Sequence, residues 1–332
     1  VESGISTVKV TEKKINRGDT KTLLKDKNGN QLYCKDGDTY REATTADYYT
    51  KDKFYRKKAN VEYRYTGWQT IDGKRFFYVN PLEVDIGISG KACTHSHVLP
   101  SRPKWYACAC CPPNAARLIG SIGKYAYGEK GDTAYCHLFT SGKVSFSNGM
   151  KLECTTSYPY DMTIKYNISG RGKVAVRIPK WSREFSLKVN SKVTSVIPKN
   201  GYIYIDVDEK AKIELALDGT PRYVRASNKV PRLTGMTALM RGPLVYCFEG
   251  TDNDDVRSIR IDRSQKPFAG EFEPDLLGGT IQLTAKAFRA EDCDDLYSCE
   301  AEKLTPCDAV AVPYYTWGNR GENDMRVWMN TI

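Results

Sequence analysis

The sequence predicts a mainly β protein in which two β-sandwich domains follow one helix and a polar N-terminal segment. Two observations support this fold class. After about residue 131, short apolar runs with a period of two are separated by Gly, Pro and Asn, as is typical of sandwich strands. Just before them, apolar residues recur at the spacing of an amphipathic helix.

The N-terminal segment, residues 1–66, is polar, contains the turn sequences "DKNGN" and "KDGD", and is assigned no fold. It carries much of the formal net charge of +10, in pieces such as "KDKFYRKK". Aromatic residues near that run leave nucleic-acid binding as an alternative. Because the basic residues are diffuse, we favour a solvated lysine-rich surface and expect no nucleic-acid partner.

The next region, residues 67–130, ends in the predicted helix. Pro112 and Pro113 supply the fixed φ of a first helical turn, and Gly128 offers an end. The apolar residues at helical spacing are Leu118, Ile119, Ile122, Tyr125 and Ala126. Their pattern indicates one helix directly before the β region.

The predicted strands fill two domains, residues 131–228 and 229–332. In the first, "KVAVRIPKW" places Val174, Val176 and Ile178 on one face, and "EFSLKV", "GYIYIDV" and "KIELAL" alternate in the same way. The second follows "ASNKVPR", which interrupts the strands, and contains "TALMRGPLVYCFEG" and "DMRVWM". No internal repeat is visible.

The cysteines and the chain's hydropathy bear on its compartment. No run of about 18 apolar residues is present, so we expect no membrane partner. The first residues lack a secretory pattern, and the eleven cysteines are uneven, unlike a disulfide framework. We therefore expect a cytoplasmic protein with reduced thiols. The scattered Cys136, Cys154 and Cys247 lie in strand patterns and are predicted to be buried.

A cysteine cluster, "YACACCPPNAARL" (106–118), lies directly before the predicted helix and contains Cys108, Cys110 and Cys111. A helix N-terminus favours thiolate over thiol, and bound Zn²⁺ deprotonates its thiols outright. A tetrahedral zinc site built on Cys110 and Cys111 needs two further ligands. The local candidates are Cys93, His95, His97, Cys108 and His137. Buried structural thiols are the alternative for the cluster, and histidines without a ligand role are favoured over ligands.

Several stretches together resemble glycoside hydrolase family 127, the β-L-arabinofuranosidase family. They are "DGKRFFYVNPLEV" (72–84), "WYACACCPPNAARLIGSIGKYAY" (105–127), "DTAYCHLFTSG" (132–142), "VRIPKWS" (176–182), "LMRGPLVYCFE" (239–249) and "VPYYTWGNRGENDMRVWM" (312–329). The resemblance runs from about Gly67 to the C-terminus. It implies that residues 67–130 are the end of an (α/α)₆-barrel catalytic domain, followed by β-sandwich domains.

The resemblance also implies a mechanism. The family's nucleophile is a zinc-bound cysteine, which falls on Cys110, and Cys110 with Cys111 would be two of the zinc ligands. A Glu would act as general acid/base in a retaining reaction through a thioglycosyl intermediate, with an arabinose-containing oligosaccharide or glycan as substrate. Whether such a protein is a monomer or a homodimer stays open.

The sequence departs from the family at the rest of the site. The family's remaining zinc ligands form a Glu-x-Cys motif upstream of the cysteine pair, and no such motif precedes Cys110 here; Cys34 has Leu32 in place of the Glu. The acid/base Glu is not found either. A non-catalytic β-sandwich remnant in carbohydrate binding or assembly therefore remains an alternative. A structural zinc module that uses Cys108, Cys110, Cys111 and a histidine is another.

Two later motifs are assigned structural roles. "RGPLVY" (241–246) is predicted to form a bend before a buried strand. Trp317, Asn319, Arg320 and Trp328 are consistent with a sugar-stacking surface, but core packing and turn formation are favoured.

Overall fold

The computed structural model describes two units of the chain, which are taken one at a time. The units are Val1–Tyr65 with Ile71–Lys74, and Thr66–Thr70 with Arg75–Ile332. The described residues are 5–8, 23–25, 31–36, 39–44, 47, 54–57, 81–86, 111–293 and 295–332. No helix among them is long and apolar enough to cross a membrane.

The first unit contains a four-stranded antiparallel sheet, where the sequence pattern assigns no fold. Its order is β1 (Ile5–Val8), β4 (Phe54–Lys57), β2 (Leu32–Asp36) and β3 (Thr39–Glu42). The sheet is built from short strands, which explains why its periodicity is weak in the sequence.

The buried residues of this sheet lie beside an ion pair. Leu32 and Cys34 are fully buried. Beside them, Arg41 donates two hydrogen bonds to the buried Asp47, at 2.6 and 2.9 Å, and the backbone N–H of Thr44 donates a third at 2.9 Å. The hydrogen bonds from Arg41 hold the pKa of Asp47 well below its usual range.

The helix of the second unit begins at the cysteine pair. α1 (Cys111–Ser121) and α2 (Gly123–Ala126) are separated at Ile122, and β6 (Tyr127–Lys130) follows at once. The predicted helix is therefore present but ends before Gly128. Ala126 is buried and its carbonyl accepts the backbone N–H of His137 at 2.8 Å, so the strand that ends beside it fixes the helix end.

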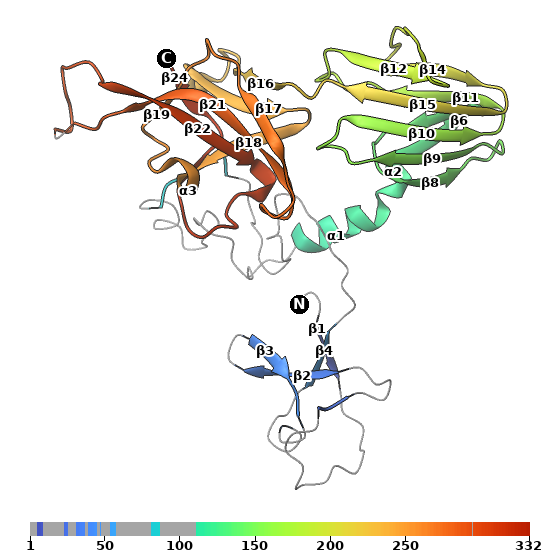
Figure 1. Ribbon diagram of the computed structural model, residues 1–332, viewed down its shortest axis with the longest axis horizontal. Helices are drawn as coiled ribbons and strands as arrows, with labels where there is room; N and C mark the ends of the chain where they lie inside the picture. Colours follow the sequence, from blue (N-terminus) through green and yellow to red (C-terminus); the bar gives the residue numbers. More distant parts are fainter. Residues whose placement is uncertain are drawn as a thin grey trace. The chain divides into compact units, whose positions relative to one another are not determined.

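The middle domain is a β-sandwich of two sheets (Figure 1). The six-stranded sheet has the order β13 (Lys192–Val193), β12 (Phe185–Val189), β15 (Lys210–Leu217), β10 (Thr163–Ser169), β9 (Lys151–Thr156), β8 (Gly142–Ser145). The four-stranded sheet has the order β14 (Tyr202–Val207), β11 (Gly172–Arg177), β7 (Thr133–Cys136), β6, in which β11 and β7 are parallel.

The core of the sandwich follows from the alternation in the sequence. In β10, Ile164, Tyr166 and Ile168 are buried, while the residues between them face outward. They share one apolar cluster with inward residues of the other sheet, among them Val174 and Ile203. Removal of this apolar surface from water, at roughly 25 cal/mol per Å², is what holds the sheets together.

The buried cysteines of the prediction lie in these cores. Cys136 and Cys154 are at most 2% exposed within the middle domain, and Cys247 is fully buried in the C-terminal domain. Burial raises the pKa of the Cys136 thiol far above its ordinary value and that of Cys154 to about 11. These cysteines are small apolar core residues, as predicted.

The C-terminal domain is one sheet that curls back on itself. Its path is β16 (Pro221–Val224), β17 (Met236–Arg241), β24 (Met329–Thr331), β19 (Ile259–Ile261), β21 (Thr280–Ala290), β22 (Leu304–Pro313), β18 (Leu244–Glu249), β23 (Met325–Arg326), β5 (Glu83–Val84), and β20 (Phe268–Glu273) pairs with β21. Because β17 also pairs with β18, the path closes around a core that contains Tyr246 and Phe248. The predicted mainly β fold class is confirmed.

The later motifs serve packing. Gly242 has a φ of 54° in the turn between β17 and β18, and a Cβ there would overlap the Met162 side chain. Trp317 is 1% exposed in an apolar cluster, and the half-buried Trp328 packs on that cluster. The sugar-stacking interpretation is therefore wrong for Trp317, because its ring faces the core.

Candidate functional site

The start of α1 is the described part of the predicted catalytic motif. Cys111 is the first residue of the helix, and Cys110 lies outside the described residues, as does the side chain of Cys111. An α-helix begins with four N–H groups that have no partner within the helix. Proline at 112 and 113 leaves two of these groups absent, so the helix starts with few backbone donors to satisfy and with φ already fixed.

The first turn is tied by its own side chains. Arg117 donates a hydrogen bond to Asn114 Oδ1 at 2.6 Å, one turn along the helix. Leu118 and Tyr125, predicted from the helical spacing, are more than half exposed, whereas Ala126 is buried. The helix is therefore held at its C-terminal end by β7 and fixed in its first turn by local contacts.

His137, one of the candidate zinc ligands, is placed in an aromatic group of the middle domain. Its Nδ1 lies 2.8 Å from the Tyr202 hydroxyl, and its ring stacks on Tyr135 with centroids 5.9 Å apart. A Cβ on Gly128 would lie 2.8 Å from Nε2, so the ring packs against this backbone. Burial, reinforced by the Arg177 charge, lowers the pKa of His137 and favours its neutral form.

The structure does not describe the other predicted ligands. Cys93, His95, His97, Cys108 and Cys110 all lie outside the described residues. In the part of the chain that the structure describes, no three side chains from His, Cys, Asp and Glu form a group that could hold a metal ion. Cys34, which lacks the upstream Glu, is buried in β2 of the first unit.

A short strand from the region before the cysteine pair is part of the C-terminal sheet. β5 pairs with β23, and Val84 is fully buried there. Arg326 reaches Glu83 at 2.7 Å and Asp85 at 3.2 Å. The backbone N–H of Ile86 donates to Asp324 at 2.6 Å, which fixes the end of the segment. Two acidic positions in "LEVDI" and the Asp and Arg of "NDMRVW" are the only sequence signals of this contact.

A buried ion network shapes the loop that follows β22. Glu249 is fully buried; it accepts the backbone N–H of Gly318 at 2.8 Å and Arg320 Nε at 3.0 Å. Arg320 also donates to Asp252 at 2.8 Å. Burial opposes the charge of Arg320, but the hydrogen bonds that Arg320 donates to Asp252 and the negative charge of Glu249 outweigh burial and raise the pKa of Arg320.

Comparison with protein families finds three consecutive matches. Residues 63–124 match the catalytic domain of GH127 β-L-arabinofuranosidases, and residues 133–219 match the middle domain of GH127 β-L-arabinofuranosidases. Residues 221–330 match the C-terminal domain of glycoside hydrolase family 127. The first match contains both the cysteine pair and β5.

The individual proteins that the chain resembles are also described as arabinofuranosidases. The non-reducing end β-L-arabinofuranosidase of Bifidobacterium longum subsp. longum is 36% identical over 279 residues, which are 78% of this chain and 42% of that protein. The crystal structure of Ara127N-Se, a GH127 β-L-arabinofuranosidase from Geobacillus stearothermophilus T6, is 37% identical with a TM-score of 0.74. That match covers 80% of this chain and 44% of the other. A GH127 β-arabinofuranosidase structure is 29% identical with a TM-score of 0.70, over 80% and 43%. The chain thus spans less than half the length of these relatives.

Proposed function

The chain belongs to glycoside hydrolase family 127, and on that premise we propose that it acts as a hydrolase of terminal β-L-arabinofuranosyl residues. The observation that carries the proposal is the order of the three domain matches, the first of which includes the cysteine pair at the start of α1. The non-reducing end specificity named for the Bifidobacterium relative supports the choice of substrate. A cytoplasmic location is part of the proposal.

In this proposal Cys110 is the nucleophile. Its sulfur forms a bond to the anomeric carbon while the glycosidic C–O bond breaks and the leaving oxygen takes a proton from a carboxylic acid. Water then displaces the sulfur while the same carboxylate takes a proton from it, and the two inversions at the anomeric carbon give net retention of configuration. The acid is a Glu that the sequence pattern does not identify. The start of α1 contributes a partial positive charge, which favours the thiolate form of the nucleophile.

The donor set fits a zinc ion in part. Two adjacent thiols at a helix start, with proline in place of two backbone donors, supply two of the four soft ligands of a tetrahedral zinc site. When bound, Zn²⁺ would keep these thiols deprotonated at neutral pH. The other ligands would come from residues beyond those that the structure describes.

Metal analysis tests this arrangement. We expect about one zinc per chain, as for a site with full tetrahedral coordination. Cys111→Ser should lose the metal, and Cys299→Ser, at an exposed cysteine of the C-terminal domain, should keep it. Zinc that survives Cys111→Ser would contradict the assignment of that ligand.

Hydrolysis of an aryl β-L-arabinofuranoside tests the nucleophile. We expect Cys110→Ala to abolish turnover while Cys299→Ser leaves it unchanged. Turnover that survives Cys110→Ala would contradict the thiolate mechanism.

A second candidate is a non-catalytic carbohydrate-binding role. The observation that favours it is that no Glu-x-Cys motif occurs between residue 1 and Cys110. Absence of both zinc and hydrolysis in the purified chain would favour this candidate over the enzyme.

A further inference from the structure

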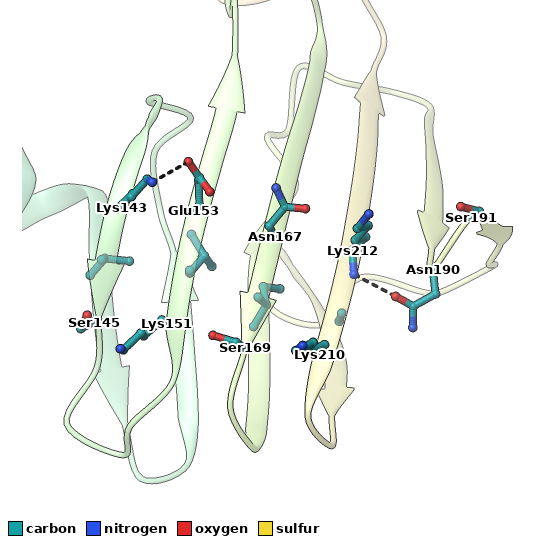
Figure 2. Close-up of a pocket in the computed structure, with 14 residues that line it drawn as sticks. Lys143, Ser145, Lys151, Glu153, Asn167, Ser169, Asn190, Ser191, Lys210 and Lys212 are labelled. Carbon is teal, nitrogen blue, oxygen red and sulfur yellow. Dashed lines mark hydrogen bonds and ion pairs between the residues drawn. The ribbon is translucent and has the colours of Figure 1, made fainter.

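The outer face of the six-stranded sheet in the middle domain forms an open groove of about 830 Å³. We call it the lysine groove and define it by Lys143, Lys151, Asn167, Ser169, Lys210 and Lys212 (Figure 2). These residues come from β8, β9, β10 and β15, at positions that point away from the core. The groove lies on a different domain from the cysteine pair, so the proposed thiol mechanism does not involve it.

The strand register sets polar residues of the groove in rows. Ser169 of β10 lies opposite Lys151 of β9 on one side and opposite Lys210 of β15 on the other. Adjacent strands are about 4.8 Å apart, so the backbones of the two lysines are about 10 Å apart with a hydroxyl between them. In the next row, Asn167 lies opposite Glu153 and Lys212.

The positive charge of the groove is mostly uncompensated. Lys143 is paired with Glu153 at 3.1 Å. Across the described part of the chain, Lys151, Lys210 and Lys212 have no carboxylate within 4 Å. The alternation of a strand requires polar residues at these positions, but it does not require three lysines around one groove whose carboxylate, Glu153, is already paired with Lys143. An anionic ligand would relieve the repulsion among these three lysines.

The groove offers donors without an aromatic surface. Its lining contains ammonium, hydroxyl and carboxamide groups, the Glu153 carboxylate that pairs with Lys143, a few aliphatic residues, and no aromatic side chain. At its edge, Asn190 accepts the backbone N–H of Lys212 at 2.8 Å, which leaves its NH₂ group as a further donor. Single-stranded nucleic acid is normally held by aromatic stacking as well as by charge, so nucleic acid fits this surface poorly. Carboxylates separated by hydroxyl groups fit it better.

We propose that the lysine groove binds a uronic-acid-containing oligosaccharide through its carboxylates. Lys151, Lys210 and Lys212 pair with the carboxylates, and Ser169 and Asn167 hydrogen-bond to sugar oxygens. The choice of a glycan among anionic polymers rests on the proposed function. The charge pattern of the groove is observed independently of that function. The groove would bind an acidic region of the glycan from which the arabinose is removed.

Titration calorimetry of the full chain with an oligogalacturonate tests the proposal. We expect binding that weakens as salt increases, and no binding of the methyl-esterified oligomer, which has the same length without charge. The triple variant Lys151→Gln, Lys210→Gln, Lys212→Gln should weaken binding about tenfold or more, from the loss of three charge pairs. A matched triple variant at exposed lysines of the C-terminal domain, Lys229→Gln, Lys266→Gln, Lys303→Gln, should bind within about twofold of the parent.

Other outcomes would overturn the proposal. Equal binding of the methyl ester, equal loss in both triple variants, or tighter binding of single-stranded DNA or of anionic vesicles would each do so. Cys110→Ala should bind the oligogalacturonate as the parent does. The proposal for the groove and the proposed hydrolytic function can therefore be refuted separately, because the first is tested by binding and the second by turnover.

Discussion

At the scale of single residues, buried charges fix the backbone of this chain. Glu249 is fully buried and holds both the Gly318 N–H and the Arg320 guanidinium. A carboxylate accepts several hydrogen bonds at once, so Glu249 helps to determine the path of this loop together with the buried Trp317. Removal of one partner of such a group is costly because it leaves the other charge buried.

Glu249→Gln should destabilise the C-terminal domain by about 2 to 4 kcal/mol, because Arg320 then loses one of its two described carboxylate partners and keeps only Asp252. Urea unfolding followed by tryptophan fluorescence measures this, since Trp317 lies in the same loop. Glu302→Gln removes a half-exposed partner of Arg260 and serves as the control, with a loss below about 1 kcal/mol. Equal losses in both variants would contradict the role of burial.

Asp47 gives a pH dependence in the first unit. Its pKa is lowered in the folded state, chiefly by Arg41, so it contributes stability above its unfolded pKa, about 4, and that contribution is lost as pH falls. We expect Asp47→Asn to destabilise the sheet by about 1 to 2 kcal/mol at pH 7, and this effect should shrink progressively below about pH 4, as the pH falls towards the lowered pKa of the folded state. Hydrogen exchange of the β2 amides measures this. A difference that grows on acidification would contradict the assignment.

At the scale of elements, the sequence predicts what local periodicity encodes. The alternating "GYIYIDV" forms β14, and the spacing from Pro112 onward forms a helix, as the sequence predicts for both. β5 was not predicted, because it is a two-residue strand whose partner β23 lies far along the chain. Its burial depends on Met325 and on a pairing that no local window contains. The first sheet was not predicted because its strands have only four or five residues and show no clear period in the sequence.

Arg326→Ala tests how β5 is held. Arg326 bridges Glu83 and Asp85, so its removal should release residues 82–86 from the C-terminal sheet without unfolding that domain. Hydrogen exchange of this segment should accelerate by about tenfold, while β21 and β22 remain protected. Arg257→Ala, at an exposed arginine paired with Asp255, should change neither. Uniform acceleration across the domain would indicate a general loss of stability instead.

At the scale of the whole molecule, the order of motifs identified the family, whereas the site could be predicted only in part. Cys110 and Cys111 follow from the motif, but the acid/base and the remaining ligands depend on residues far away in the sequence. Spacing alone offered His137 as a ligand, and the structure places it against Tyr135 and Tyr202. Periodicity could not distinguish a zinc ligand from a histidine that packs against tyrosines, because either role places a histidine beside a strand.

The cysteines should divide into three classes of reactivity, which tests fold and site together. Cys293 and Cys299 are exposed and should react with a thiol reagent at pH 8 within minutes. Cys136 and Cys154 should react only after unfolding, because burial and raised pKa values keep them as thiols. If Cys110 and Cys111 hold zinc, they should become reactive after chelation, before any unfolding. Peptide mapping by mass spectrometry assigns each cysteine to its class. If Cys110 and Cys111 are modified at the same rate with and without chelator, the zinc site is contradicted, whereas the fold is not.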